Sequence, residues 1–379
     1  MDKTTQTKPV KVLQIGMTRN LGGLETYLIQ QFEHIDHSRV MYDFVNITAE
    51  NDMVYSSQIT AAGGKIFDIP SRHNGPVRHY LQWFKLLRKV AKDYKAIVLN
   101  SNGLTYVFPL FLARFFGIPR RIIHSHNSNF EHSLGLLKNL LIKFNRALLF
   151  WSATDYFACS EKAGNWMFGV NHPFTVIHNA IETGNFIFNE EMREKKREEL
   201  GITDEFVIGH VGRFSYQKNH SYLIDIFNSF HKKHPHSILL LAGGSLEDDS
   251  YLQKARNKVN NLGLGPSVKF LGMRTDVPEL MQSMDCFLLP SHFEGLPLVG
   301  IEAQASGLPC FFSDAITREL GITDLAHFIS LEASPERWAD AIEKYSRITR
   351  KNMQKEIADA EYDIDEEIKK IQAFYCRMI

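Results

Sequence analysis

Short apolar runs alternate with longer stretches of helical spacing along most of the chain, and this alternation limits the fold more than any other feature. In the first half, buried strands are predicted at residues 10–15, 42–47, 96–99, 121–123 and 156–159. After the first run, Leu24, Leu28, Phe32 and Ile35 recur on one face of a helix. Strands that alternate with helices in this way form parallel sheets.

A second series of the same kind follows a charged, sparsely apolar stretch at residues 190–200, which is predicted to be a helix that ends at Gly201. Its strands are predicted at residues 206–211, 238–242, 268–271, 286–289 and 310–313. Ser334 and Pro335 have the capping pattern that begins a further helix. We therefore expect an α/β protein with two doubly wound domains, which also fits a length of 379 residues.

The charge balance and the termini exclude several classes of protein. Lys plus Arg and Asp plus Glu each number 43, so the chain has no net field to hold nucleic acid. No secretory signal and no run of roughly 20 apolar residues is present, so we expect a soluble cytoplasmic protein. The four cysteines lie far apart without metal-ligand spacing, which predicts reduced core thiols.

Ligands of parallel sheets bind beyond the carboxyl ends of the strands, so the loops there hold the candidate site. The loop after the first strand contains Gly22 and Gly23 at the start of a helix. Paired glycines allow a ligand to approach the backbone, and a helix N-terminus favours an anion, although a plain tight turn would look the same. The loop is neither a dinucleotide-binding fingerprint nor a P-loop.

Two histidines follow the strand predicted at residues 121–123. Strand alternation places His124 and His126 on the same face of the sheet. A zinc pair is conceivable, but no third ligand is suggested nearby. A hydrogen-bonding role toward a substrate is the favoured interpretation.

The loop after the first strand of the second half carries Arg213 and Lys218. Both can turn toward one diphosphate, Arg213 through its planar fork and Lys218 as a point charge. Two solvated surface cations remain the alternative.

The most specific pattern lies at residues 290–302. Glu294 follows a buried strand, and Pro297 suits the first turn of a helix whose free amides can receive a phosphate. Glu302 lies in the apolar stretch 298–305, where a carboxylate is costly unless it meets donors such as ribose hydroxyls. A glutamate on a solvated helix face is the alternative.

Two further stretches call for interpretation. Residues 363–365, Asp-Ile-Asp, have the spacing of a metal-binding triplet but are expected to be solvated surface in a charged tail. Residues 133–151 are strongly apolar and are interrupted by Lys138, Lys143 and Arg146. This stretch fits a helix at an anionic membrane surface and equally an amphipathic core helix with solvated cations.

Taken together, these loops resemble the signature of the family-four retaining glycosyltransferases, which include bacterial exopolysaccharide and capsule enzymes. The sharpest element is the ExxxxxxxE spacing of Glu294 and Glu302. Residues 22–25, the pair Arg213 and Lys218, and residues 176–181 support it. The resemblance implies the GT-B fold, with two Rossmann-like domains that face a cleft.

The resemblance also implies a division of the chain. Residues 1–185 would form an acceptor-side domain and residues 186–355 a domain that binds the nucleotide sugar. Residues 356–379 would form a C-terminal helix that crosses back to the first domain.

Roles for individual residues follow from the same resemblance. Arg213 and Lys218 would neutralise the leaving diphosphate, Glu302 would bind the ribose, and His126, or else His124, would contact the transferred sugar. The catalytic residues would be His126, Arg213, Lys218 and Glu294. The donor-binding residues would be Gly22, Gly23, Arg213, Lys218, Met273, Arg274, Glu294, Gly295, Leu296, Pro297, Leu298 and Glu302.

The implied activity is transfer of a hexose from a nucleotide diphosphate sugar, with a UDP-sugar expected, to a saccharide or lipid-linked acceptor with retention of configuration. No metal or other cofactor is expected, and synthesis of surface polysaccharide or glycoconjugate is the expected context. Peripheral contact with the cytoplasmic face of the inner membrane would suit a lipid-linked acceptor. The alternatives are a nonenzymatic accessory subunit that binds nucleotide sugar or acceptor, and a UDP-sugar 2-epimerase.

Overall fold

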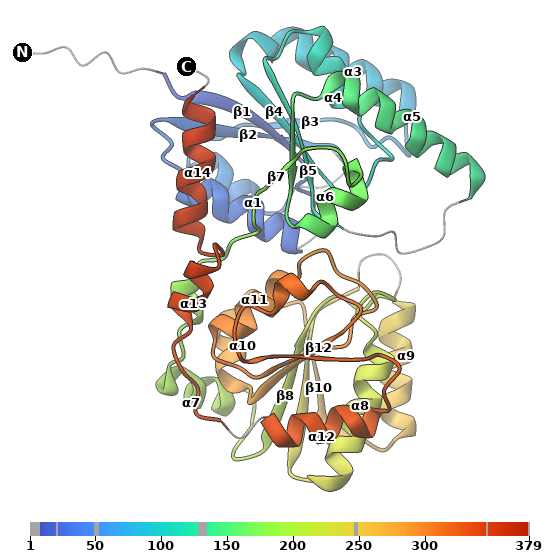
Figure 1. Ribbon diagram of the computed structural model, residues 1–379, viewed down its shortest axis with the longest axis vertical. Coiled ribbons are helices and arrows are strands. Elements are labelled where there is room, and N and C mark those ends of the chain that lie inside the picture. Colours follow the sequence, from blue (N-terminus) through green and yellow to red (C-terminus); the bar gives the residue numbers. More distant parts are fainter. Residues whose placement is uncertain are drawn as a thin grey trace, which may run out of the picture. The chain divides into compact units, whose positions relative to one another are not determined.

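The computed structural model describes residues 8–19, 22–48, 53–127, 135–245, 249–345 and 348–377. The chain divides into two compact units, each a parallel-sheet domain of the Rossmann-like kind (Figure 1). Unit 1 is Met1–Ala180 with Ile364–Ile379, and unit 2 is Ile181–Asp363.

These boundaries, after Ala180 and Asp363, differ by five and eight residues from the expected ones after residues 185 and 355. The two chain crossings lie side by side, because Ile181 forms a parallel bridge with Asp363 and its amide donates to the Tyr362 carbonyl at 2.9 Å. The Asp363 carboxylate also accepts from the Thr183 hydroxyl at 2.6 Å. Asp363 is therefore a half-buried part of the crossing, which corrects its expected role as solvated surface.

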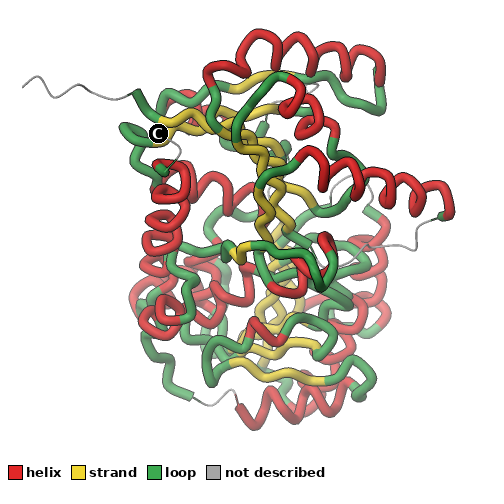
Figure 2. The backbone as a smooth tube through the Cα atoms, turned by 45° about the horizontal axis from the view of Figure 1, so that its top comes forward, coloured by secondary structure: helices red, strands yellow, loops and turns green. Residues whose placement is uncertain are grey.

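Unit 1 contains a seven-stranded parallel sheet in the order β3-β2-β1-β4-β5-β6-β7. Figure 2 shows the strands in yellow and the helices in red. The strands are β1 (Val10–Ile15), β2 (Val40–Asn46), β3 (Ile66–Asp68), β4 (Ala96–Ser101), β5 (Arg120–Ser125), β6 (Asp155–Ala158) and β7 (Thr175–Val176). The helices are α1 (Gly23–His34), α2 (Ser56–Ala61), α3 (Pro76–Val90), α4 (Phe108–Phe115), α5 (Leu136–Ser152) and α6 (Glu161–Phe168). All five strands predicted for this half are present, and β3 and β7 are additional.

The last helix, α14 (Ile364–Cys376), belongs to unit 1, where it packs against α1 and β2. The Asp365 carboxylate lies 2.8 Å from Nδ1 of His34, and the Gln372 side chain accepts from the Asp36 amide at 2.9 Å. Tyr375 packs edge-on against Tyr42 of β2, with ring centroids 5.9 Å apart. These two polar contacts and this aromatic contact hold α14 against unit 1.

Unit 2 contains a six-stranded parallel sheet in the order β10-β9-β8-β11-β12-β13. The strands are β8 (Phe206–Val211), β9 (Ser237–Ala242), β10 (Val268–Gly272), β11 (Cys286–Leu289), β12 (Cys310–Ser313) and β13 (Ala326–Ile329). The helices are α7 (Glu190–Glu199), α8 (His220–Lys233), α9 (Ser250–Asn261), α10 (Val277–Ser283), α11 (Leu298–Ala305), α12 (Pro335–Tyr345) and α13 (Gln354–Asp359). The five predicted strands are confirmed, and β13 is additional.

The cysteines are free thiols, and Cys159, Cys286 and Cys310 are buried, which confirms the expected core role for these three. Within the described part of the chain, no helix has the length and apolar character needed to cross a bilayer.

Candidate active site

Glycines lie at the carboxyl edge of the unit 2 sheet, at the ends of β8, β9 and β10. Gly243 has a φ of +147°, and a Cβ there would lie 2.0 Å from the carbonyl oxygen of Gly212. The Gly243 amide donates to the Gly272 carbonyl at 2.8 Å, and the Phe214 amide donates to that of Gly244 at 3.0 Å. These glycines allow the loops after β8, β9 and β10 to pack closely together at this edge.

Lys218 and Glu294 come from the loops after β8 and β11, and they form a largely buried ion pair at 2.7 Å. The two strands are neighbours in the sheet, so their carboxyl ends bring the two loops together. Gln217 donates to the other Glu294 oxygen at 2.8 Å and to the Phe293 carbonyl at 3.0 Å. Loop-to-loop hydrogen bonds thus fix both charges at the sheet edge.

Arg213 lies on the same loop as Lys218 but is exposed. Its guanidinium has no ion pair or hydrogen bond with any residue that the structure describes. An exposed guanidinium on the same loop as a fixed ammonium can receive an anion without first breaking an internal contact.

Glu302 lies on α11, the helix whose start was predicted near Pro297. No side chain caps the start of this helix at Leu298, so its first amides are open to a ligand. The Glu302 carboxyl has no hydrogen bond or ion pair among the described residues. Burial raises its pKa to about 7, and the positive charge of Lys218 opposes this rise in part. The group is thus a half-buried carboxyl without a protein donor among the described residues.

Met273 and Arg274 follow β10, where a contact with the base is expected. Met273 is exposed and lies over the glycine loop, because a Cβ on Gly244 would come within 2.7 Å of its Cγ. The Arg274 guanidinium instead donates to the Asp276 carboxylate at 2.7 Å and lies 3.3 Å from that of Glu199. The Arg274 guanidinium is therefore paired with carboxylates in this structure, and a contact with the base would require it to leave them.

The first loop of unit 1 leads from β1 into α1. Gly16 has a φ of +135°, and a Cβ there would lie 2.7 Å from Cβ of Asn100, so only glycine fits. Gly22 is the N-cap of α1, which begins at Gly23, and no side chain caps this helix end. The Thr18 hydroxyl donates to Glu25 at 2.7 Å across the turn. Residues 20 and 21 of the predicted loop lie outside the described residues.

His124 and His126 share one face of β5 and its extension, as alternation predicts, with ring centroids 4.0 Å apart. Burial lowers the pKa of His126 to about 3 and that of His124 well below its usual value, so both rings are neutral near pH 7. Nε2 of His126 lies 3.1 Å from the Asn100 side-chain oxygen. The histidine pair can offer hydrogen bonds but no charge.

Within the described ranges, neither histidine belongs to a group of three possible metal ligands. The one such group there combines Asp204, Glu205 and His236 at the surface of unit 2. It lies around the start of β8, at the opposite end of the strand from Lys218.

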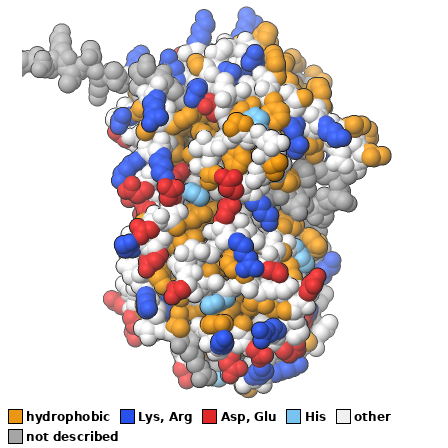
Figure 3. All heavy atoms as spheres, in the orientation of Figure 1, with side chains coloured by type: hydrophobic (Ala, Val, Ile, Leu, Met, Phe, Trp, Pro, Cys, Tyr) orange, Lys and Arg blue, Asp and Glu red, His pale blue; other side chains and the backbone are white. Residues whose placement is uncertain are grey.

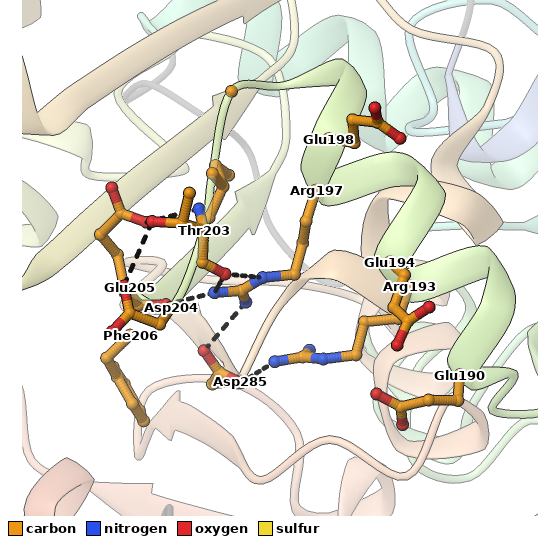
Figure 4. Close-up of a pocket in the computed structure, with 12 residues that line it drawn as sticks. Glu190, Arg193, Glu194, Arg197, Glu198, Thr203, Asp204, Glu205, Phe206 and Asp285 are labelled. Carbon is orange, nitrogen blue, oxygen red and sulfur yellow. Dashed lines mark hydrogen bonds and ion pairs between the residues drawn. The ribbon is translucent and has the colours of Figure 1, made fainter.

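A hollow of about 660 Å³ also lies at the amino ends of the unit 2 strands, beside α7 (Figure 4). Arg193 and Arg197 point into it from α7, and both reach Asp285, at 2.6 and 3.5 Å. Asp285 in turn accepts from the Val207 amide at 2.7 Å. Both arginine charges are matched by this internal partner, so the two side chains join α7 to the sheet.

Sequence reasoning missed Gln217, Gly243, Gly244 and Gly272. The glycines had a usable signal, since a glycine pair directly follows β9 and a single glycine ends β10. The role of Gln217 left no signal in the sequence, because it depends on which loop lies opposite in the folded protein.

The chain matches a known protein family and several known proteins. The family model described as glycosyl transferases group 1 matches residues 192–362, which lie in unit 2 and contain its candidate site residues. The putative glycosyltransferase EpsF of Bacillus subtilis (strain 168) is 30% identical over 368 residues, which is 94% of each chain. A UDP-Gal:alpha-D-GlcNAc-diphosphoundecaprenol alpha-1,3-galactosyltransferase of Escherichia coli is 24% identical over 82% of this chain and 81% of its own.

Among solved structures, Anabaena Alr3699/HepE in complex with UDP and glucose is similar in fold. It has a TM-score of 0.79 at 20% identity and covers 96% of this chain and 99% of its own. At this level of identity the likeness concerns the fold alone.

Proposed function

The chain belongs to the group 1 glycosyl transferases, and on this premise we propose that it moves a hexose from a UDP-sugar to a saccharide or lipid-linked acceptor with retention of anomeric configuration. Glycosyl transfer itself follows from the family. The donor, the stereochemistry and the acceptor are the proposed parts.

The observation that carries the proposal is the charge arrangement at the carboxyl edge of the unit 2 sheet. Lys218 is held at 2.7 Å from Glu294, and Arg213 stands exposed on the same loop. A fixed cation such as Lys218 stabilises charge as it develops on a leaving diphosphate and needs no reorganisation at the moment of reaction. Arg213, unpaired among the described residues, can add its charge to the same anion. The uncapped start of α11 can add its amides to the same anion.

A uridine diphosphate fits the remaining groups. Bare glycine backbone at Gly243 and Gly244 suits a flat base, with Met273 beside it. The Glu302 carboxyl lacks a donor, and ribose hydroxyls would supply one. The Escherichia coli relative is named for a UDP-galactose donor, and the Anabaena structure holds UDP and glucose.

Retention would follow from same-face displacement. The bond between the sugar C1 and the diphosphate oxygen breaks, the acceptor oxygen forms the new bond to C1, and the acceptor proton passes to the departing phosphate. Glu294 would hold sugar hydroxyls, and the neutral ring of His126 would donate or accept a hydrogen bond at the transferred sugar. Gly22 and Gly23 would face the diphosphate and acceptor.

The acceptor is proposed to be a growing saccharide, free or lipid-linked, in the synthesis of a surface polysaccharide. The Escherichia coli relative is named for a diphosphoundecaprenol-linked acceptor. That name supports the lipid-linked form.

Substitution of two charged site residues tests the proposal. We expect Lys218→Ala and Glu302→Ala each to lower the transfer rate by at least about tenfold, because each removes a charged contact to the donor. Lys195→Ala, an exposed lysine on α7, is the matched control and should retain full activity. Near-normal transfer by either site variant would count against the assigned roles.

Product analysis separates the proposal from its alternatives. Incubation with the UDP-sugar alone should give no change at C2 of the sugar, whereas an epimerase would convert the donor without an acceptor. An accessory subunit would bind the donor yet release no UDP even with acceptor present.

Removal of divalent metal tests the role given to the cations. We expect transfer to continue in EDTA, because Arg213 and Lys218 supply the charge that a metal would otherwise provide. Initial rates measured with and without EDTA check this. Complete loss of activity, restored by added Mg²⁺ or Mn²⁺, would overturn the proposed charge assignment.

A further inference from the structure

Three successive helices of unit 1, α3, α4 and α5, carry an apolar and cationic surface, which we call the α3–α5 face. α4 packs against both α3 and α5 (Figure 1). Of the nineteen large apolar side chains found exposed among the described residues, twelve lie on these three helices. Such a concentration is far more than the scattered exposure that is ordinary on a soluble surface.

The amino-terminal half of α5 is the most exposed part. Leu136 and Leu137 are each 84% exposed, Leu140 is 62% exposed and Phe144 is 65% exposed. Leu136, Leu140, Phe144 and Trp151 recur at helical spacing, so they form one stripe along the helix. The core-facing residues of α5 lie mostly in its second half, where Asn145, Leu149 and Ser152 are buried.

Aromatic contacts make the face continuous from one helix to the next. Tyr80 of α3 packs against Phe108 of α4 with ring centroids 4.7 Å apart. Phe111 of α4 packs against Trp151 of α5 at 5.7 Å. The apolar surface is therefore one patch rather than three separate stripes.

The charge of the face has a single sign. The forty residues of α3, α4 and α5 include eight Lys or Arg and no Asp or Glu. An average stretch of that length in this chain has about four or five acidic residues, since 43 are spread over 379. Lys138 and Lys143 are exposed beside the stripe on α5, and the Arg114 guanidinium lies 4.2 Å from the centre of the Trp151 ring. Apolar and basic side chains lie together along α5 in Figure 3.

We propose that the α3–α5 face docks on an anionic lipid bilayer, with its apolar side chains in the interfacial region and its cations against lipid phosphates. Leucine and aromatic side chains flanked by lysine and arginine are the composition that such surface helices need. Each cation near an anionic leaflet adds attraction that salt screens.

Charge complementarity favours lipid over the other possible occupants. A two-fold contact between copies of this chain would set one acid-free face against another and bring cations together. The centre of a typical protein interface is depleted in lysine, whereas lysines stand within this face. An anionic bilayer satisfies both the apolar stripe and the surrounding charge.

Vesicle flotation of the full chain tests the proposal without donor or acceptor, so its outcome is independent of the transfer reaction. We expect binding to phosphatidylcholine vesicles with a quarter phosphatidylglycerol, weak binding to phosphatidylcholine alone, and loss of binding at high salt. The double variant Leu140→Ser with Phe144→Ser should bind at least about tenfold more weakly. Val170→Ser, 78% exposed in the same unit but off the face, is its control and should bind normally.

The charge contribution is tested separately. Lys138→Gln with Lys143→Gln should weaken binding to the anionic vesicles by about tenfold or more. Lys195→Gln in unit 2 should leave it unchanged. Equal binding to both vesicle types, no binding, or wild-type binding by the face variants would overturn the proposal. So would a dimer on size-exclusion chromatography that Leu140→Ser with Phe144→Ser dissociates, since the face would then serve self-association.

Discussion

Glu302 shows how one side chain links the site to the stability of the protein. Its pKa rises from 4.5 to about 7, chiefly because burial disfavours the charged form. A carboxylate kept without a donor is costly for the folded state. The cost is understandable if the group is reserved for a ligand that supplies the missing hydrogen bonds.

This cost predicts a pH dependence that is measurable without substrate. Between pH 4.5 and about 7, the folded protein keeps the Glu302 proton while the unfolded chain releases it, so the free energy of unfolding falls as pH rises through this window. The side chain introduced by Glu302→Gln does not ionise, so this variant avoids the free-energy cost of a charged carboxylate in the folded protein. We expect the variant to gain on the order of 2 kcal/mol over wild type at pH 8, with little difference near pH 4.5. Urea denaturation across this range measures it, and a pH-independent difference would refute the explanation.

Lys218 and Glu294 mark the limit of prediction at the residue scale. Their positions after two buried strands made both candidate site residues. That they pair with each other at 2.7 Å could not be read from spacing, because it depends on β8 and β11 being neighbours. The same holds for Arg274, whose carboxylate partners come from α7 and from its own loop.

Among the elements, the largely buried inner strands were the most predictable. Residues 10–15, 206–211, 286–289 and 310–313 were predicted with the bounds that β1, β8, β11 and β12 have, since each is a mostly buried apolar run. β3 and β7 are edge strands of three and two residues, too short for any periodic pattern. β13 contains His327 and is only half-buried, so its composition resembles that of a loop. The sequence pattern that predicts a strand is weaker where the strand pairs on one side only and has an exposed face.

The turn after β9 has a backbone geometry that leaves no room for a side chain at Gly243. In Gly243→Ala, the new methyl would meet the Gly212 carbonyl in a backbone conformation that already disfavours L-residues. We expect unit 2 to lose about 1–3 kcal/mol of stability and to bind UDP more weakly. Chemical denaturation and calorimetric titration measure the two effects.

Gly265→Ala is the control for that substitution, because a Cβ at this position meets nothing within 4 Å. It should change stability by no more than about 0.5 kcal/mol. Equal effects of the two substitutions would mean that the turn adapts and that its bare backbone is not required.

At the scale of the whole molecule, the two units each have their own parallel sheet and buried core. Sequence alternation predicted this duplication, whereas the division after residues 185 and 355 came from the family resemblance and differs from the unit boundaries after Ala180 and Asp363. The paired crossing at Ile181 and Asp363 was not predictable, because it joins segments far apart in sequence. α14 completes unit 1 although the residues just before it, including α13, remain in unit 2.

Two cores predict two thermal transitions, and the proposed donor site predicts which of them responds to ligand. Every residue assigned to the UDP moiety and its cations, apart from Gly22 and Gly23, lies in unit 2. UDP at about 100 times its dissociation constant should therefore stabilise the unit 2 transition by roughly 2.7 kcal/mol and leave that of unit 1 nearly unchanged. Ile371→Ala on α14 and Ile342→Ala on α12 remove buried side chains and assign the two transitions in scanning calorimetry. Lys218→Ala should abolish most of the shift, and a shift confined to the unit 1 transition would place the nucleotide on the other domain.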